Sequence, residues 1–316
     1  MNKRRMFLAL VLLLVATIVA IPSLFARGGS QTSGKRPVVG FCNIAETAPQ
    51  HTIIKESMER AAAAKGYDLI YMNNRLDGQV AVANADAMLL RGIDVFIEFN
   101  VDASVAPVIM EKMNAAKVPV IAVDIGHPGA VYFGANNFGV GPIVGEYLGN
   151  VCREKWGGEP EAMLIIEDPM SGAAVLARTD NIPDGFRKIF PNFPNSKIFK
   201  IDGGIDTSTT QTRVANFLSA NPNIQKLAIA PAHSTYRLGA SAAVETANRQ
   251  NQCIIVSQGE YDYLEYLKSN RTGVCRKTFQ AHFDFRKRPL PSILNTTAQR
   301  TWRPHRTMLN LDVNKF

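Results

Sequence analysis

The sequence has few cysteines, and none of them stands at a spacing typical of a metal or redox site. Its four cysteines, Cys42, Cys152, Cys253 and Cys275, are far apart and form neither a CxxC pair nor a His/Cys cluster. The motifs G-x-x-x-x-G-K-[ST], H-E-x-x-H and G-x-S-x-G are also missing, so the common nucleotide, zinc-protease and hydrolase sites have no support. We therefore predict no catalytic site, no metal and no cofactor, and we expect Cys42 and Cys253, which stand in apolar runs, to be core residues.

Most of the chain has no excess of charge of either sign. Residues 1–270 hold 25 Lys and Arg against 25 Asp and Glu, whereas residues 271–316 hold ten against two and carry the whole net charge of +8. The body is therefore no binder of polyanions, and we predict no nucleic-acid partner. The alternative is that the basic tail, interleaved with aromatic residues such as Phe279 and Trp302, binds nucleic acid or anionic lipid.

The N-terminus has the order of a secretory signal. Three basic residues precede the apolar run 6–21, and a small residue, Ala26, closes the segment. A membrane span needs about 20 apolar residues, which this run does not reach, so we predict a signal peptide over residues 1–26 and an exported, periplasmic protein. The last three of these residues, Leu-Phe-Ala, resemble the start of a lipobox, but Arg27 stands where the lipid-bearing cysteine would be. We expect residues 27–36 to form a flexible tether.

Short apolar runs of strand length alternate with helical patterns from residue 37 onward. This alternation, with short connections, predicts right-handed βαβ units and mostly parallel sheets covered by helices. The rhythm restarts at residue 136, which predicts two α/β lobes, residues 37–135 and residues 136–270. The predicted strands are 37–42, 68–72, 95–98, 118–123, 131–134, 162–166, 197–201, 226–230 and 253–256, and the predicted helices are 51–65, 79–90, 103–116, 139–154, 173–190, 207–220, 234–247 and 261–268.

The stretch 117–145 lies where the two predicted lobes meet. It holds two short strands that end in polar residues, Asp124 after the first and Asn136 with Asn137 after the second. Because ligands bind outside the carboxyl ends of parallel strands, these side chains stand where a ligand would be held. The alternatives are a turn or cap role for Asp124 and a turn role for the asparagines. The glycines that follow have the spacing G-x-G-x-x-x-G and not that of the dinucleotide fingerprint.

Five segments, taken in order, carry a family resemblance. They are RGIDVFIEFNVD at 91–102, VPVIAVD at 118–124, NNFGVG at 136–141, ARTDNIPDGF at 177–186 and RLGASAA at 237–243. In this order and spacing the chain resembles the periplasmic sugar-binding proteins of the ribose-binding type, the soluble receptors of ABC importers. The resemblance implies the type I periplasmic binding protein fold, in which two Rossmann-like lobes with parallel sheets are joined by a hinge and close on a ligand in the cleft.

The resemblance also implies a function and a set of ligand contacts. The chain is expected to be the exported solute-binding protein of an ABC importer, a monomer without enzymatic activity, with a sugar or related polyol as its ligand and the transporter permease as its partner. Carboxylate, guanidinium and amide groups suit a polyol because they accept from and donate to its hydroxyls. By motif position, the expected ligand-binding residues are Gln50, His51, Gln79, Asp124, Asn137, Arg178, His233 and Gln258.

Departures from the family pattern keep other ligands open. Gln50 and His51 stand where the family often carries aromatic residues that stack on the sugar, and His233 and Gln258 stand near positions usually held by Asn and Asp. A sugar acid or a nucleoside is therefore an alternative ligand, and a structural role is the alternative for each histidine.

The C-terminal segment 271–316 departs further. Basic residues and prolines interrupt its apolar runs, and only residues 307–313, near a C-terminus that again resembles the family, are predicted as a strand. A pair of compensating frameshifts, which would give a non-functional product, is one interpretation of this loss and recovery. Repressors of the lac type share the fold but begin with a helix-turn-helix, where this chain has an export signal.

Overall fold

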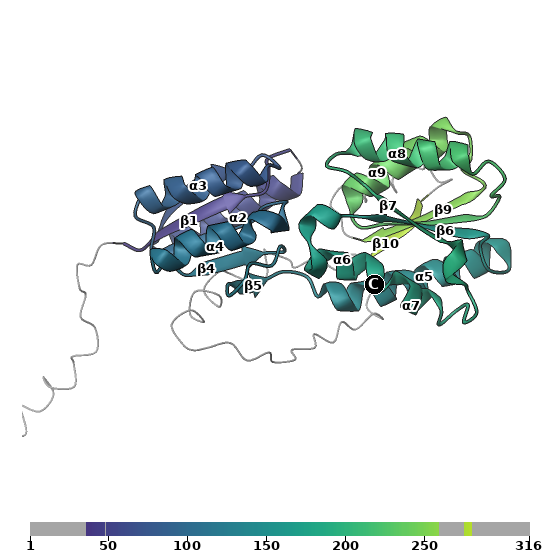
Figure 1. Cartoon of the computed structure of the whole chain (residues 1–316), viewed down its shortest axis with the longest axis horizontal. Helices are drawn as coiled ribbons and strands as arrows, with labels where there is room; N and C mark the ends of the chain where they lie inside the picture. Colours follow the sequence, from purple (N-terminus) through teal and green to yellow (C-terminus); the bar gives the residue numbers. More distant parts are fainter. Residues whose placement is uncertain (1–35, 48, 259–274, 280–316) are drawn as a thin grey trace, which may run out of the picture. The chain divides into compact units, whose positions relative to one another are not determined.

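The computed structural model describes residues 36–47 and 49–258, together with the backbone of residues 275–279, and it forms two separate five-stranded parallel sheets with helices on their faces (Figure 1). The predicted signal peptide, almost all of the tether, the predicted helix 261–268 and the predicted strand 307–313 lie outside the described residues. Within the part of the chain that the structure describes, no helix is both long enough and apolar enough to cross a membrane.

The first sheet has the strand order β2-β1-β3-β4-β5, and all of its strand pairs are parallel. Parallel neighbours cannot be joined by a tight hairpin, and the crossovers are helical except for the one from β4 to β5, which is a loop. One face is covered by α3 and α4, whose side chains cluster with Cys42 and Phe96, and the other by α2, whose side chains cluster with Phe41 and Ile97. The elements are β1 (Val38–Asn43), α2 (Pro49–Lys65), β2 (Asp68–Asn73), α3 (Gly78–Leu90), β3 (Val95–Glu98), η1 (Ala103–Val105), α4 (Ala106–Ala115), β4 (Val120–Val123) and β5 (Val131–Phe133).

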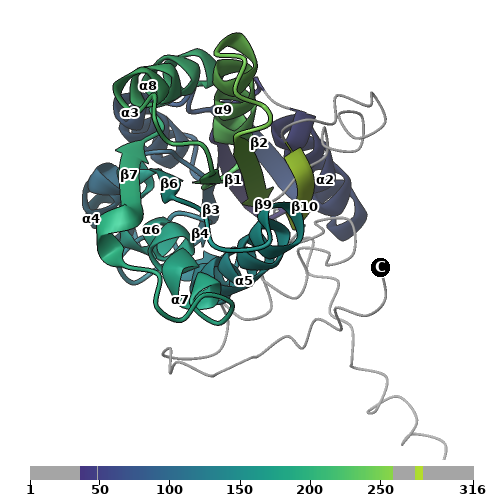
Figure 2. The ribbon, with the colours of Figure 1, turned by 90° about the vertical axis from the view of Figure 1, so that its right-hand side faces the viewer.

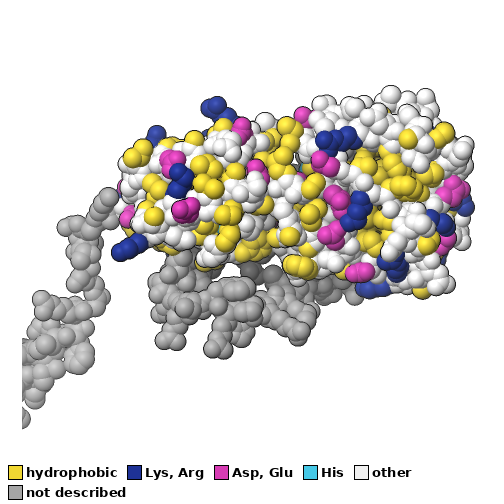
Figure 3. Space-filling view, viewed as in Figure 1, with side chains coloured by type: hydrophobic (Ala, Val, Ile, Leu, Met, Phe, Trp, Pro, Cys, Tyr) yellow, Lys and Arg dark blue, Asp and Glu magenta, His cyan; other side chains and the backbone are white. Residues whose placement is uncertain are grey.

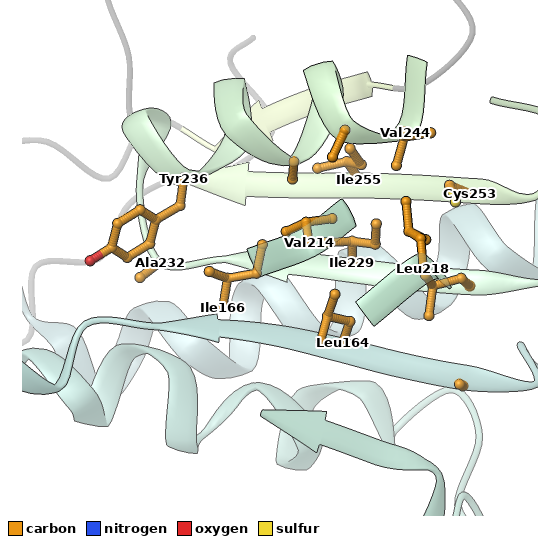
Figure 4. Close-up of a cluster of buried hydrophobic side chains, with 14 residues drawn as sticks. Leu164, Ile166, Val214, Leu218, Ile229, Ala232, Tyr236, Val244, Cys253 and Ile255 are labelled. Carbon is orange, nitrogen blue, oxygen red and sulfur yellow. The ribbon is translucent and has the colours of Figure 1, made fainter. Parts of the chain in front are cut away.

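The second sheet has the order β10-β9-β8-β6-β7 and is also parallel throughout. Alternate residues of each strand point to opposite faces, so a sheet covered on both sides needs apolar residues at every position. Leu164 and Ile166 pack toward α8 and α9 in the cluster drawn in Figure 4, whereas Met163 and Ile165 pack toward α5 and α7. The elements are α5 (Asn137–Trp156), β6 (Ala162–Glu167), η2 (Pro169–Ser171), α6 (Ala173–Asp180), α7 (Ile182–Phe186), η3 (Asn195–Lys197), β7 (Ile198–Asp202), α8 (Thr207–Ala220), β8 (Leu227–Pro231), α9 (Ser234–Thr246), β9 (Cys253–Gln258) and β10 (Cys275–Phe279).

The predicted fold class, two α/β lobes with parallel sheets, is confirmed, and most predicted elements lie within a few residues of the observed ones. The segment 173–190, predicted to be largely helical, holds two helices, α6 and α7, with a break at Asn181. Pro183 lies in the first turn of α7 and has no N–H to continue the hydrogen-bond ladder of α6, which explains the break. The buried Cys42 and Cys253 are core residues, as predicted.

One strand of the structure lies in the C-terminal segment 271–316. Within this segment, only residues 307–313 were predicted as a strand. Residues 275–279 form β10, which runs parallel to β9 at the edge of the second sheet (Figure 2). An edge strand pairs on one side only and tolerates charged residues, so it does not require the continuous apolar run on which the prediction relied. The prediction of no strand before residue 307 is therefore wrong for these five residues.

The glycines of α5 form a packing face. Gly141, Gly145 and Gly149 recur at four-residue spacing, so they lie on one side of the helix. A Cβ atom on Gly141 would lie 2.9 Å from the carbonyl oxygen of Arg178, and one on Gly145 would overlap the carbonyl oxygen of Ile182. The backbone of α5 therefore packs directly against α6 and α7, and this close approach explains the glycine spacing without any cofactor.

Charges of both signs are interspersed over the described residues. Figure 3 shows Lys and Arg side chains beside Asp and Glu side chains on the face that it displays. Several form ion pairs, among them Lys112 with Asp86 at 2.8 Å and Lys188 with Glu146 at 2.9 Å. This agrees with the balanced charge of residues 1–270 and gives that face no basic patch for a polyanion.

Candidate functional site

Arg178 lies at the centre of a polar cluster in the second lobe. It stands near the end of α6, and its guanidinium donates from Nε and from Nη2 to the side-chain oxygen of Asn137, at 3.0 and 2.8 Å. Its Nη1 donates to the carbonyl oxygen of Ala232 at 3.4 Å. Three of the five N–H groups of the guanidinium are thus held by the protein, and the other two have no hydrogen-bond partner among the described residues of the range 36–258.

Gln258 joins the same cluster from the end of β9. Its Nε2 donates to the carbonyl oxygen of Ala232 at 2.8 Å, so Gln258 and Arg178 share one acceptor. Ala232 directly follows β8, and β8 and β9 are neighbours in the sheet. Parallel strands end at the same edge, so Ala232 after β8 and Gln258 at the end of β9 meet there, and Arg178 reaches the same carbonyl from α6. Gln258 is 5% exposed, and its Nε2 is engaged by the protein.

His233 and Asp168 extend the cluster along the same edge. His233 Nε2 lies 3.8 Å from Asp168 Oδ2, and the His233 ring stacks on Tyr236 with a centroid distance of 3.9 Å. Burial raises the pKa of Asp168, while hydrogen bonds from Ser171 and the charge of Arg178 lower it. The Tyr236 hydroxyl donates to the carbonyl oxygen of Gly204 at 2.6 Å, which fixes the ring under His233.

Asp124 occupies a strained turn at the end of β4 in the first lobe. Its φ is 56°, in the left-handed region that non-glycine residues rarely adopt. Its Oδ1 accepts from the backbone N–H of Ala135 at 3.1 Å, and a Cβ on Gly134 would lie 2.5 Å from the same oxygen. The strain is offset by this local hydrogen bond, so Asp124 serves partly as the turn residue that was the alternative, and it remains half-buried at the strand end.

Two charges shift the pKa of Tyr132, the Asp124 carboxylate of the first lobe and the Arg178 guanidinium of the second. Burial and, to a lesser extent, the Asp124 carboxylate raise the pKa of Tyr132 to about 12, against the Arg178 guanidinium, which lowers it. Both charges therefore act on one phenol. Its hydroxyl donates to the carbonyl oxygen of Ala135 at 3.2 Å.

Gln50 and His51 begin α2, directly after β1. The backbone oxygen of His51 accepts from Asn43 Nδ2 at 3.0 Å, and His51 Nδ1 is buried with no hydrogen-bond partner among the described residues. Burial lowers the pKa of His51, so its ring is neutral at pH 7. Since β1 and β4 are parallel members of one sheet, these two residues and Asp124 stand at the same edge.

Gln79 is separate from the other predicted residues. Its side chain is exposed, and its backbone N–H donates to the helix cap Asp77 at 2.7 Å. No hydrogen bond within the described ranges joins it to the other seven residues. Its role as a ligand contact stays a prediction.

The sequence reasoning did not single out Asp168 and Tyr236. Asp168 directly follows β6, so the rule that selected Asp124, a polar residue after a buried strand, would also have found it. Tyr236 is 2% exposed within α9, where its aromatic ring reads as a core residue. Only the fold brings it under His233.

The chain is similar to a known protein family over most of its length. Residues 39–272 match the family described as periplasmic binding protein domain. The ribose import binding protein of Bacillus subtilis is 23% identical over 272 residues, covering 84% of this chain and 83% of the relative.

Solved structures share the fold. An ABC sugar transporter subunit from Rhodobacter sphaeroides matches with a TM-score of 0.66 at 17% identity, over 85% of this chain and 94% of the other. A solute-binding protein from Bacillus halodurans with bound myo-inositol matches with a TM-score of 0.63 at 19% identity, over 77% and 82%. One from Actinobacillus succinogenes with bound D-allose matches with a TM-score of 0.58 at 21% identity, over 74% and 83%.

Proposed function

The chain belongs to the periplasmic binding protein family, and from this premise we propose that it is the exported solute-binding protein of an ABC importer, with a sugar or related polyol as its ligand. The curated relative is named as a ribose import binding protein, and two structural neighbours carry bound myo-inositol and D-allose. The transporter permease would be its partner, and it would act as a monomer in the periplasm. The proposal contains no catalytic step.

One observation carries the proposal. A half-buried carboxylate, Asp124, directly follows β4 in the first lobe, and a guanidinium, Arg178, near the end of α6 in the second lobe is fixed by hydrogen bonds to Asn137 and Ala232. A carboxylate accepts hydrogen bonds from two neighbouring hydroxyls, and a guanidinium donates two, and such charge-assisted bonds are stronger than neutral ones. Asp168 and His233 add a further acceptor and a neighbouring imidazole at the same edge as Arg178. This set of groups suits a ligand rich in hydroxyls.

Binding would act by a population shift. An open form exchanges with a closed form, and the ligand favours the closed form because only then do groups of both lobes contact it. Three N–H groups of the Arg178 guanidinium are already hydrogen-bonded to the protein. This supports the mechanism, because a donor that is fixed before the ligand arrives loses little conformational entropy on binding.

A thermal-shift screen of the full chain tests the function. D-ribose, D-allose and myo-inositol would be added separately, because a ligand that binds only the native state raises its melting temperature. At a concentration of about 100 times Kd, the stabilisation is about 2.7 kcal/mol, and we expect a rise of roughly 5 to 10 °C. A broader set of pentoses, hexoses and polyols follows. A folded chain that responds to no member of this set contradicts the proposal.

Replacement of Asp124 should weaken sugar binding. Asp124→Ala removes a charged acceptor, so we expect a loss of about 1.5 to 3 kcal/mol in binding free energy, roughly 10-fold to 150-fold in Kd. Asp124→Asn keeps the Oδ1 acceptor for Ala135 and tolerates the left-handed backbone, so it separates loss of charge from loss of the turn. Asp86→Ala, at an exposed aspartate paired with Lys112, is the matched control. Calorimetry that gives equal affinities for Asp124→Ala and the control would exclude Asp124 from the site.

A further inference from the structure

The Asn137 side chain is turned toward Arg178 and away from solvent. Asn137 is 3% exposed, and its single side-chain oxygen accepts both the Nε–H and an Nη2–H of Arg178. Its Nδ2 is buried and has no hydrogen-bond partner among the described residues. The only acceptor of this buried side chain is thus doubly occupied by Arg178 and is not available to a ligand hydroxyl, and only Nδ2 keeps unused N–H groups.

The position of Asn137 in the chain explains how it reaches Arg178. It is the first residue of α5, directly after its cap Asn136, and α5 lies against α6 and α7 through its glycine face. Gly141, one turn further along α5, would place a Cβ 2.9 Å from the backbone oxygen of Arg178 itself. The two helices therefore approach closely at this level, and a side chain of asparagine length spans the remaining gap.

From this geometry we infer that Asn137 is a positioning residue, whose side-chain oxygen holds the Arg178 guanidinium in its ligand-binding orientation before any ligand is present. The inference rests on the proposed function for its consequence in sugar binding, and it revises the predicted role of Asn137 from ligand contact to support of a ligand contact. The Ala232 carbonyl holds the opposite end of the guanidinium, so the group is fixed from two sides. An arginine fixed in this way is preorganised, because it need not lose side-chain freedom on binding.

The orphan Nδ2 of Asn137 suggests a decisive pair of variants. Asn137→Ala removes the acceptor. Asn137→Asp keeps the acceptor and replaces the unpartnered N–H₂ by a second oxygen, so Nε and Nη2 of Arg178 can bond a carboxylate in the bidentate geometry that arginine favours. Asn136→Ala is the matched control, since it removes the cap bond to the Gly139 N–H at the same helix start without touching Arg178.

The first measurement uses the ligand-free full chain. The hydrogen-exchange rate of the Arg178 Nε–H is followed by ¹H–¹⁵N NMR, with the signal assigned by its absence in Arg178→Lys. We expect exchange at least tenfold faster in Asn137→Ala, and rates within threefold of the wild type in Asn137→Asp and Asn136→Ala. An Asn137→Ala rate within twofold of the wild type overturns the inference. Should Asn137→Ala fail to fold, Asn137→Ser, whose side chain is too short to span the gap, takes its place with the same expectation.

The second measurement is calorimetry with D-ribose, D-allose and myo-inositol. For a sugar that binds the wild type, we expect at least a tenfold weaker Kd in Asn137→Ala, substantial recovery in Asn137→Asp, and little change in Asn136→Ala. A wild-type Kd in Asn137→Ala despite faster Nε–H exchange overturns the inference, because the guanidinium would then not need its support. If no sugar binds the wild type, the proposed function fails, while the exchange measurement still decides whether Asn137 positions Arg178.

Discussion

The Gly145→Ala variant is expected to lose about 3 kcal/mol of unfolding free energy, because a methyl group there meets backbone and not a movable side chain. The added Cβ would overlap the carbonyl oxygen of Ile182 and lie 2.7 Å from the backbone nitrogen of Phe186. A Cβ on Gly185 of α7 would likewise overlap the carbonyl oxygen of Pro142 in α5. A side chain at either glycine would therefore force α5 and α7 apart. Alanine gains about 1 kcal/mol in helix propensity over glycine, which offsets only part of the cost.

Thermal unfolding followed by circular dichroism would measure this loss as a fall of roughly 10 °C in melting temperature. Gly139→Ala is the matched control in the same helix, since the nearest atoms to its Cβ belong to the side chain of Asn136, at 3.1 Å or more. We expect the control to be neutral or slightly stabilised. Equal melting temperatures for the two variants would show that α5 and α7 can separate without cost.

The fold was predictable because it depends on patterns that are local in sequence. Apolar runs of strand length alternate with helical spacing, and a parallel sheet covered on both faces follows from that alternation. Where the prediction failed, a non-local cause decided the outcome. The edge strand β10 needs only one neighbour, and its charged residues hide it from a search for apolar runs.

The site was predictable to the extent that it follows from strand ends. Asp124, His233 and Gln258 stand at or just beyond the carboxyl ends of strands, as expected, and Asp168 obeys the same rule. The hydrogen bonds between Asn137 and Arg178 were beyond sequence reasoning, because they join residues 41 positions apart through the close packing of two helices. Sequence selected both residues, but only the geometry distinguishes a group that supports from a group that binds.

Glu98 is a buried acid with a raised pKa, and no sequence pattern predicted it. It ends β3 in the first lobe and is 0% exposed. Burial raises the pKa of its carboxyl from 4.5 to about 8, against the polar side chains of Asn100, Asn74 and Cys42, which lower it. Asn74 Nδ2 donates to Glu98 Oε1 at 2.9 Å, while Oε2 has no hydrogen-bond partner in the described part of the chain. In the folded protein the carboxyl is therefore mostly protonated at pH 7.

Asn100, which interacts with Glu98, contacts His127 in turn. Asn100 Nδ2 lies 3.2 Å from His127 Nε2, and His127 Nδ1 lies 3.0 Å from the carbonyl oxygen of Ile125. Burial lowers the pKa of His127, so its neutral ring donates to Ile125 and accepts from Asn100. The Asn100 Oδ1 is then a buried acceptor without a partner among the described residues.

The stability of the folded chain should consequently depend on pH through Glu98. The unfolded carboxyl has its ordinary pKa of 4.5 and the folded one a pKa of about 8, so the stabilisation is fully present below pH 4.5 and is lost as pH rises to 8. Between these values the slope is about 1.4 kcal/mol per pH unit, and the total is on the order of 5 kcal/mol. Glu98→Gln resembles the protonated acid at every pH, because its amide carries no charge and keeps an oxygen that accepts from Asn74.

Urea unfolding at pH 5 and pH 8 would therefore show Glu98→Gln close to the wild type at the lower pH and about 3 kcal/mol more stable at the higher one. The difference between variant and wild type isolates Glu98 from other titrating groups. Glu56→Gln, at an exposed glutamate paired with Arg60, is the control and should follow the wild type at both values. A difference between Glu98→Gln and the wild type that stays constant with pH would mean that Glu98 is ionised in the folded state at both pH values. The buried carboxylate would then have to be stabilised by its neighbours Asn74, Asn100 and Cys42.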